Sequence, residues 1–127
     1  MSEYGDKYYY KDGTTSGEYD DSKDLHRIDG PAIEYINGTK SWYMDGKLHR
    51  VGGPAIERST GTKSWYMDGN LHRIDGPAMD RADGAKHWCI DGKSYLEEEF
   101  DQLIKEIKDL PPAVRLTDPR EWVRKVS

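Results

Sequence analysis

The stretch "LHRIDGPA" that begins at Leu25 decides the fold, because the chain repeats it as "LHRVGGPA" from Leu48 and again as "LHRIDGPA" from Leu71. The copies open three consecutive units of 23 residues, which carry identical residues at eleven positions and have no insertion between them. The units are residues 25–47, 48–70 and 71–93. A fixed period of this length is typical of units that bury their apolar faces on one another. The sequence therefore predicts a tandem array.

Each unit has two strand-like runs around a glycine turn. In the first unit "PAIEYI" and "TKSWYM" flank an Asn-Gly pair at residues 37–38, which favours a two-residue type I′ turn. Such a turn sets Ile33 opposite Trp42 on the face that packs against neighbouring units. The other face then carries Tyr43 beside Ala32. A second turn, Asp-Gly, leads the chain into the next "LHR". We therefore predict a mainly β fold, a tandem β-hairpin repeat array.

Both ends of the chain differ from the repeated units and are predicted to cap them. Residues 1–24 are expected to form a degenerate N-terminal hairpin, because "YYKDG" is similar to the "WYMDG" of the units, followed by a polar insertion. Residues 94–127 are predicted to form a C-terminal α-helical cap. A capping box from Ser94 to Glu97 precedes apolar residues at helical spacing. These residues are Leu96, Phe100, Leu103, Ile104, Ile107 and Leu110.

The end of the chain leaves two further expectations. A short terminal helix that carries Trp122 and Val123 is expected to follow the first one, with Asp118 as its N-cap. The apolar stripe of the first helix could instead bind a partner or a second copy of the chain, so a homodimer stays open.

Composition and charge weigh against several classes of function. The formal net charge is −5 at pH 7, with Lys and Arg mixed among Asp and Glu, so no basic field exists for a nucleic-acid backbone. No apolar run is long enough to cross a bilayer, and the polar start "MSEYGDKYYY" is unlike a signal peptide. The lone cysteine, Cys89, cannot form an internal disulfide. We therefore expect a cytoplasmic protein without a membrane span.

The unit resembles the MORN repeat, a β-hairpin repeat of similar period. The resemblance is carried by an aromatic strand followed by "DGKLHR", a glycine and the "NGTK" turn, over residues 25–93. The chain departs from the MORN pattern at "GPA" and at the tryptophans Trp42, Trp65 and Trp88. This variant is similar to repeats in hypothetical proteins of tailed phages and giant viruses, and less so to antitoxin or immunity proteins. The resemblance implies an interaction or scaffold module, whose partner would be a host protein, and no catalytic residue carries over.

The face opposite the predicted packing face is the candidate surface for a protein partner. A tyrosine beside a small residue stays accessible, and tyrosine gives a large contact area at a small entropy cost. Tyrosines that only cover the sheet are an equally good interpretation. The candidate partner-binding residues are Tyr43, Tyr66, Glu34, Glu57 and Asp80.

The "LHR" copies place histidines and arginines at a regular interval, and these are the candidates for binding a nucleotide or a lipid headgroup. They are His26, Arg27, His49, Arg50, His72 and Arg73. A structural interpretation is stronger, in which each histidine anchors the turn to its neighbouring unit and each arginine stacks on a tryptophan of the adjacent unit. A metal site is not predicted, because zinc needs clustered ligands.

Catalysis is not predicted either. Cys89 and His87 lie two apart on one strand, opposite Asp80, and no oxyanion hole accompanies them. The chain has no phosphate-loop, G-x-S-x-G or H-E-x-x-H motif. The predicted function is a non-enzymatic protein-interaction module without a cofactor, in its sharpest form a phage-encoded binder or inhibitor of a host defence protein. The alternatives are a small-ligand-binding protein and an antitoxin or immunity protein.

Overall fold

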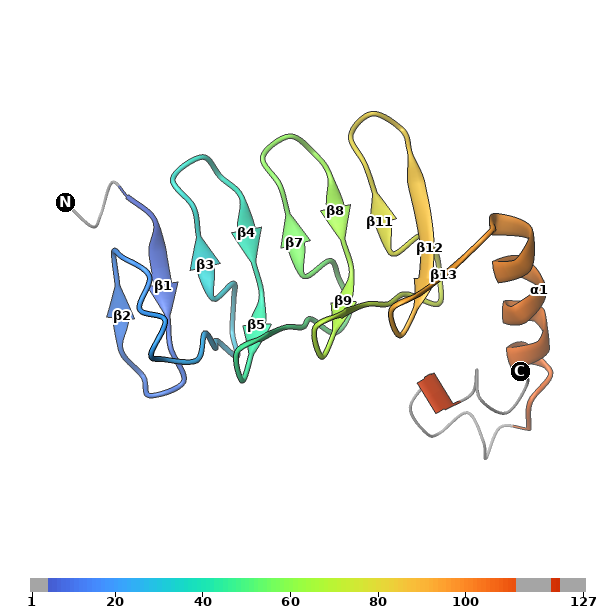
Figure 1. Cartoon of the computed structure of the whole chain (residues 1–127), viewed down its shortest axis with the longest axis horizontal. Helices are drawn as coiled ribbons and strands as arrows, with labels where there is room; N and C mark the ends of the chain where they lie inside the picture. Colours follow the sequence, from blue (N-terminus) through green and yellow to red (C-terminus); the bar gives the residue numbers. More distant parts are fainter. Residues whose placement is uncertain (1–4, 112–119, 122–127) are drawn as a thin grey trace.

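The computed structural model describes residues 5–111 and 120–121 of the 127-residue chain. Over these residues the protein is mainly β, with a nine-stranded antiparallel sheet, two two-stranded sheets and helix α1 at the C-terminal end (Figure 1). The strand order in the large sheet is β13-β12-β11-β8-β7-β4-β3-β1-β2. Figure 1 shows the hairpins side by side along the longest axis of the molecule, with α1 beyond the last of them.

Most of the elements are short. The large sheet contains β1 (Lys7–Tyr9), β2 (Thr15–Ser16), β3 (Ile33–Glu34), β4 (Lys40–Ser41), β7 (Ile56–Glu57), β8 (Lys63–Ser64), β11 (Met79–Asp80), β12 (Lys86–Ile90) and β13 (Lys93–Tyr95). The small sheets pair β5 (Tyr43–Met44) with β6 (Lys47–Leu48), and β9 (Tyr66–Met67) with β10 (Asn70–Leu71). Helix α1 spans Glu97–Lys108. The three copies of the motif supply the hairpins β3–β4, β7–β8 and β11–β12.

The loop between β3 and β4 is one residue longer than predicted. The Gly38 N–H donates to the Tyr35 carbonyl at 3.0 Å, and Gly38 has φ of 95°. These features define a type I turn followed by a glycine bulge, a three-residue loop. Ile33 consequently lies opposite Ser41, and the predicted pairing of Ile33 with Trp42 is wrong.

The one-residue shift exchanges the faces of the sheet, because side chains alternate along a strand. Ile33 and Tyr43 lie on one face, which we call the groove face, in contact with the same hydrophobic cluster. On the other face, the arginine face, the guanidinium of Arg50 contacts both Trp42 and Glu57. Trp42 and Ile33 therefore lie on opposite faces of the sheet and do not share the predicted packing face.

The Asp-Gly pairs, predicted as connectors between units, form the two-residue turns of short hairpins. Asp45 has φ of 51° and Gly46 has φ of 79°, the left-handed values that a type I′ turn requires at both central positions. Met44 then pairs with Lys47 in the β5–β6 sheet. The Asp-Gly pairs of the other two units have the same conformation.

Each "LHR" segment holds the Asp-Gly turn of its own unit. In the first unit the Asp45 N–H donates to Nδ1 of His26 at 3.0 Å, and the Gly46 N–H donates to the Leu25 carbonyl at 2.9 Å. His49 and His72 accept the equivalent backbone donors at 3.1 and 3.0 Å. The histidines therefore do hold turns, but each holds the turn of its own unit, and the predicted anchoring to the neighbouring unit through this side chain is wrong.

The N-terminal edge of the sheet is the β1–β2 hairpin, in which Tyr9 takes the place of a unit tryptophan. The guanidinium carbon of Arg27 lies 3.9 Å from the centroid of the Tyr9 ring. The His26 N–H donates to the Tyr9 carbonyl at 3.0 Å, as the His49 N–H does to Trp42. The first unit thus makes with β1 the same contacts that each later unit makes with the unit before it.

Helix α1 covers the last hairpin. Its buried face and the strands beneath it form one hydrophobic cluster, made of Ile90, Phe100, Leu103 and Ile107 with Trp88, Tyr95 and Ile104 packed against it. The start of the helix differs from the prediction. Leu96 is the N-cap and is 70% exposed, and the Glu99 carboxylate accepts the Leu96 N–H at 2.9 Å, so the predicted box from Ser94 to Glu97 is wrong.

The predicted terminal helix with Asp118, Trp122 and Val123 falls on positions outside the described residues. Among the described residues no helix has the length and apolar character that a membrane span requires.

Candidate functional site

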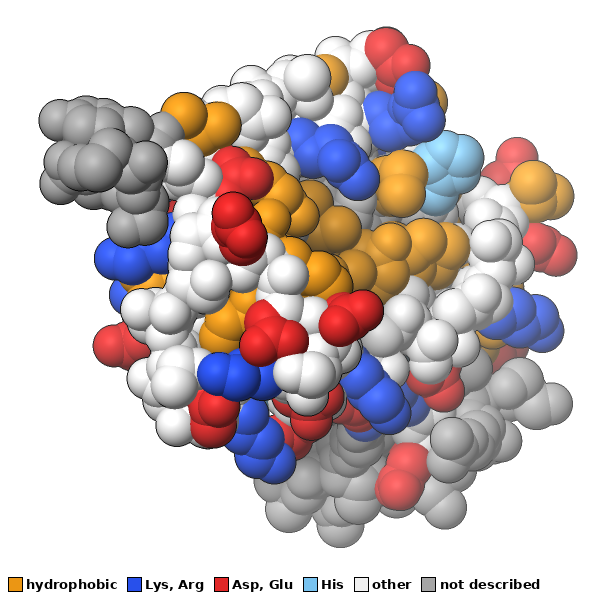
Figure 2. All heavy atoms as spheres, turned by 60° about the vertical axis from the view of Figure 1, so that its left-hand side comes forward, with side chains coloured by type: hydrophobic (Ala, Val, Ile, Leu, Met, Phe, Trp, Pro, Cys, Tyr) orange, Lys and Arg blue, Asp and Glu red, His pale blue; other side chains and the backbone are white. Residues whose placement is uncertain are grey.

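The groove face is hollowed at the N-terminal end of the sheet, where it forms an open cavity of about 510 Å³. We call this cavity the tyrosine pocket. It is lined by Tyr8, Tyr19, Tyr35 and Tyr43, by Asp21, Lys23 and Asp24, and by the buried side chains of Leu25 and Ile33. Figure 2, in which this end of the molecule comes forward, shows a band of hydrophobic side chains between charged ones.

The tyrosine rings of the pocket lie close to one another. The ring centroids of Tyr8 and Tyr19 are 5.8 Å apart, with the ring planes inclined by 48°. Burial raises the pKa of the Tyr43 hydroxyl, and the nearby hydroxyls of Tyr35, Tyr19 and Tyr66 add to the rise. Burial is also the main cause that raises the pKa of Tyr8. Both shifts favour the neutral phenol, so the pocket presents uncharged O–H groups.

Three of these hydroxyls are available to a ligand. Tyr19, Tyr35 and Tyr43 have no hydrogen-bond partner for their hydroxyls within the described part of the chain. By contrast, the Tyr9 hydroxyl donates to Glu34 at 3.0 Å on the other face of the sheet. The pocket therefore combines apolar ring surface with unused hydrogen-bond donors.

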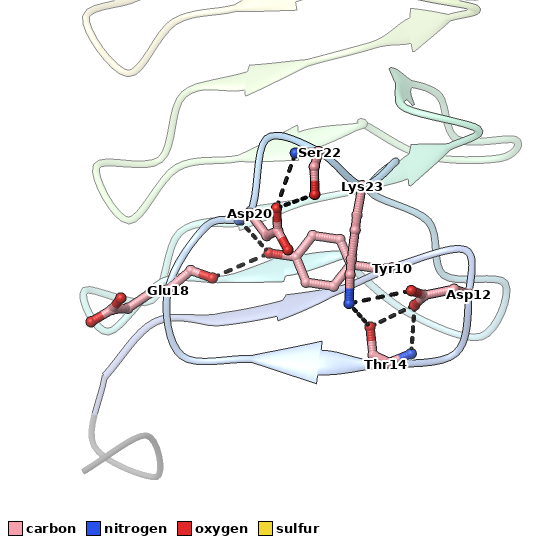
Figure 3. A network of polar contacts seen from close by, with 7 residues as sticks. All are labelled: Tyr10, Asp12, Thr14, Glu18, Asp20, Ser22 and Lys23. Carbon is pink, nitrogen blue, oxygen red and sulfur yellow. Dashed lines mark hydrogen bonds and ion pairs between the residues drawn. The ribbon is translucent and has the colours of Figure 1, made fainter.

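The polar insertion forms the outer wall of the pocket, and Tyr10 organises it (Figure 3). The Tyr10 hydroxyl donates to the Glu18 carbonyl at 3.2 Å and accepts the Asp20 N–H at 2.8 Å. The Lys23 ammonium binds Thr14 at 3.0 Å and Asp12 at 3.3 Å. Hydrogen bonds and an ion pair thus hold the polar insertion at several residues, although the sequence alone suggests a loop.

The rim of the pocket is acidic. Neither Asp21 nor Asp24 has an ion-pair partner among the described residues. Lys23, the cation of the lining, is already paired with Asp12. The Asp21 carboxylate is therefore uncompensated, whereas the Asp24 carboxylate lies near the ammonium of Lys11 and helps to raise the pKa of that lysine.

The structure separates the predicted partner-binding residues into two groups. Tyr43 and Tyr66 lie on the groove face, paired across short hairpins with Leu48 and Leu71. The acidic residues lie on the arginine face; they are Glu34, Glu57 and Asp80. The predicted common surface of tyrosines and carboxylates is wrong, because the longer hairpin loop shifted the register by one residue.

The acidic residues of the arginine face alternate with lysines across the large sheet. Directly paired positions run in the order Lys7, Glu34, Lys40, Glu57, Lys63, Asp80 and Lys86. Opposite charges at directly paired positions stabilise a sheet. We call this row the charge ladder. It neutralises the arginine face and leaves no acidic stripe on it.

Two of the three arginines of the "LHR" copies stack on a tryptophan of the preceding unit, as predicted, and Arg27 stacks on Tyr9 instead. The guanidinium carbons of Arg50 and Arg73 lie 3.8 Å from the ring centroids of Trp42 and Trp65. Arg50 also donates to the Pro54 carbonyl at 3.0 Å and to Glu57 at 3.2 Å. These arginines are therefore engaged in holding the sheet together.

A second hollow of about 600 Å³ lies between two successive connector loops on this side of the protein. It brings together Arg27, His49 and Arg50, with Ile28 and Val51 exposed beside them. The side chains of Arg27, His49 and Arg50 already form hydrogen bonds within the protein. Fewer of their donors and acceptors are therefore available to a nucleotide or a lipid headgroup.

The residues considered for catalysis are not assembled. His87 lies opposite Met79, and Asp80 lies opposite Lys86, so the predicted opposition of His87 and Asp80 is wrong. Cys89 is buried, with its Sγ 3.7 Å from Oγ of Ser94. Within residues 5–111 and 120–121, no group of three or more His, Cys, Asp or Glu side chains is arranged to hold a metal ion.

Comparison with known proteins adds no analogy, since no family model, curated protein or solved structure matches the chain.

Sequence reasoning missed Tyr8, Tyr19 and Tyr35 as pocket residues. Tyr8 lies on β1, and Tyr35 directly follows β3. Tyr19 belongs to the polar insertion, which resembles a spacer in the sequence. A signal was present, because Tyr19 is the one aromatic residue in an otherwise polar run from Lys11 to Asp24.

Proposed function

We propose that the protein is a non-enzymatic protein-interaction module, built as a MORN-like repeat protein, which binds a partner protein along its groove face. The tyrosine pocket carries this proposal, because it gathers four aromatic rings, unused hydroxyls and an acidic rim in one open cavity. Tyrosine is enriched at protein interfaces because its ring gives a large contact area and its hydroxyl a hydrogen bond.

The groove face also continues beyond the pocket. Tyr66 on β9, Ile56 on β7 and Met79 on β11 are half-buried, so apolar surface stays available along the sheet. A stable protein interface needs about 800 Å² from each partner, more than one pocket supplies. The length of the sheet supports a partner that runs along the groove from the pocket.

The arginine face is a poorer candidate for the same role. The carboxylates of its charge ladder lie opposite lysines on the neighbouring strands, and they also form ion pairs, Glu34 with Arg27, Glu57 with Arg50 and Asp80 with Lys86. A partner there would have to replace interactions that the sheet already makes.

In its sharpest form, the proposed module is a phage-encoded inhibitor that binds a host defence protein in the cytoplasm of the host. The support for this form is the resemblance of the units to repeats in phage and giant-virus proteins. The groove face supports the proposal that the ligand is a protein, and the resemblance supports the proposal that this protein belongs to the host.

The test is affinity capture from host lysate, followed by reconstitution with the purified, identified partner. The bait proteins are the native chain, a groove variant with Tyr19→Ala and Tyr66→Ala, and a control with Ile28→Ala, which removes an exposed side chain that does not line the pocket. We expect a partner that the native chain and the control retain and the groove variant loses. Equal retention by all three, or no partner at all, would contradict the proposal.

A further inference from the structure

The tyrosine pocket has the chemistry of a site for proline-rich peptides. Such peptides adopt the polyproline II helix, which has no internal hydrogen bonds, so its carbonyls remain available as acceptors. Proline has no N–H, so a surface that binds it needs donors and apolar contact area. The hydroxyls of Tyr19, Tyr35 and Tyr43 are such donors. We propose that the tyrosine pocket binds a proline-rich segment that carries a basic residue, an inference that rests on the proposed protein-binding function.

The neighbouring rings give the pocket a continuous aromatic surface. Tyr8 and Tyr19 stand 5.8 Å apart with their planes inclined by 48°, and the aliphatic side chains of Leu25 and Ile33 are buried below. Aromatic-lined grooves are the general solution for recognising proline-rich segments, because flat rings pack against the pyrrolidine rings.

The pocket is also organised before a ligand arrives. Tyr8 lies on β1, which is paired with both β2 and β3. Tyr19 lies between Glu18 and Asp20, whose backbones are both held by the Tyr10 hydroxyl (Figure 3). A preorganised site spends less binding free energy on ordering its own side chains. A polyproline II ligand is stiff as well, so both sides lose little entropy on binding.

Charge complementarity selects the basic residue of the ligand. Asp21 and Asp24 line the pocket without ion-pair partners in the described chain, whereas Lys23 is held by Asp12. An arginine beside the prolines can form a charge-assisted hydrogen bond with Asp21, whereas Asp24 already interacts with Lys11. An acidic segment would be repelled by the same rim.

The test is fluorescence anisotropy with the full chain and a labelled peptide of sequence Arg-Pro-Pro-Leu-Pro-Arg-Pro-Pro-Leu-Pro. We expect saturable binding in the micromolar range. Tyr19→Ala should weaken it roughly tenfold, as loss of an interface tyrosine commonly does. Asp21→Lys should also weaken it, more at low salt than at high salt. Ile28→Ala, at an exposed site outside the pocket, should leave the affinity unchanged.

Controls separate a lost site from a lost fold. A peptide with alanine at each proline position should bind much more weakly, and thermal unfolding of each variant should match that of the native chain. If Tyr19→Ala does not fold, Tyr19→Leu replaces it, since it keeps bulk and removes the flat ring and the hydroxyl. The inference is overturned by absent saturable binding, by equal affinity for the alanine peptide, or by unchanged affinity in the Tyr19 variant.

The outcomes also separate this inference from the proposed function. If capture yields a partner that depends on the groove while the proline-rich peptide does not bind, the peptide inference falls and the interaction module stands. If neither a partner nor the peptide binds, both fall.

Discussion

The guanidinium carbon of Arg50 lies 3.8 Å from the centroid of the Trp42 ring, so a cation–π contact fastens the second unit to the first. Arg73 makes the same contact with Trp65 in the next pair of units. The last tryptophan, Trp88, has no following unit to supply an arginine and packs against the hydrophobic cluster of helix α1 instead. The helix therefore covers the ring that the repeated arrangement leaves open.

Replacing Arg50 with lysine should lower the free energy of unfolding. An ammonium group has no planar surface to stack on Trp42, and it cannot bind the Pro54 carbonyl and Glu57 in the same fork geometry. We expect a loss of about 1–2 kcal/mol, measured by urea unfolding. Arg58→Lys, at an exposed position, is the matched control and should change stability by less than about 0.5 kcal/mol. Equal losses in both variants would show that the stacking contributes nothing specific.

We expect that alanine in place of the "GPA" glycine, which all three units share, lowers the stability of the protein. A Cβ atom at Gly53 would lie 3.0 Å from Cζ of Arg50, so the guanidinium would have to leave its place over the indole. We expect Gly53→Ala to destabilise by about 1–3 kcal/mol, as overpacking does. In an Arg50→Ala background the same substitution should cost less, because the group it meets is gone. A double-mutant cycle measures this coupling, and additive effects would refute the close approach as the cause.

The features that the sequence predicted are those that depend on spacing along the chain. The 23-residue period places Arg50 and Arg73 near the tryptophan of the preceding unit, and this contact could be inferred without knowing which way a side chain points. That a histidine holds a turn was also inferred, but not that the turn belongs to its own unit.

The register could not be inferred in the same way, because Asn-Gly suits two loop lengths. Here the Asn37 side chain accepts the Thr39 N–H at 2.9 Å within the longer loop, and Oγ1 of Thr39 accepts the Ser59 N–H of the next unit at 3.0 Å. A contact between units thus accompanies the longer loop. The tyrosine pocket could not be predicted for a related reason. Tyr19 contacts Tyr8 only because the polar insertion folds back over the first hairpin.

His49 should be replaceable by asparagine but not by alanine. Nδ1 of His49 accepts the Asp68 N–H at 3.1 Å, and an asparagine side-chain oxygen can accept the same donor. We expect His49→Ala to cost about 1 kcal/mol and His49→Asn to cost clearly less. Hydrogen exchange of the Asp68 amide should accelerate in the alanine variant alone. Equal acceleration in both would mean that ring packing, rather than the hydrogen bond, holds the turn.

Reversing one charge in the ladder should destabilise the sheet in a salt-dependent way. Lys63 lies directly opposite both Glu57 and Asp80, so Lys63→Glu places three carboxylates side by side. We expect a loss of about 1 kcal/mol at low ionic strength that shrinks as salt is added. Lys47→Glu, opposite the uncharged Met44, is the control and should show a smaller loss with little dependence on salt.

Tyr43 should make the protein sensitive to alkali. Burial, reinforced by the nearby tyrosine hydroxyls, raises the pKa of Tyr43 above that of the unfolded chain, so folding favours the neutral phenol. The stability that this contributes is fully present below the unfolded pKa of about 10 and is lost as the pH rises through the higher folded pKa. Tyr43→Phe keeps the ring and removes the proton, so the variant should match the native chain at neutral pH. Its urea midpoint should fall less steeply above pH of about 10, although Tyr8, whose pKa burial also raises, still titrates. Adding Tyr8→Phe should flatten the profile further. An unchanged alkaline profile in both variants would show that these phenols remain in contact with water, and the pocket would then be more open than the burial of Tyr43 indicates.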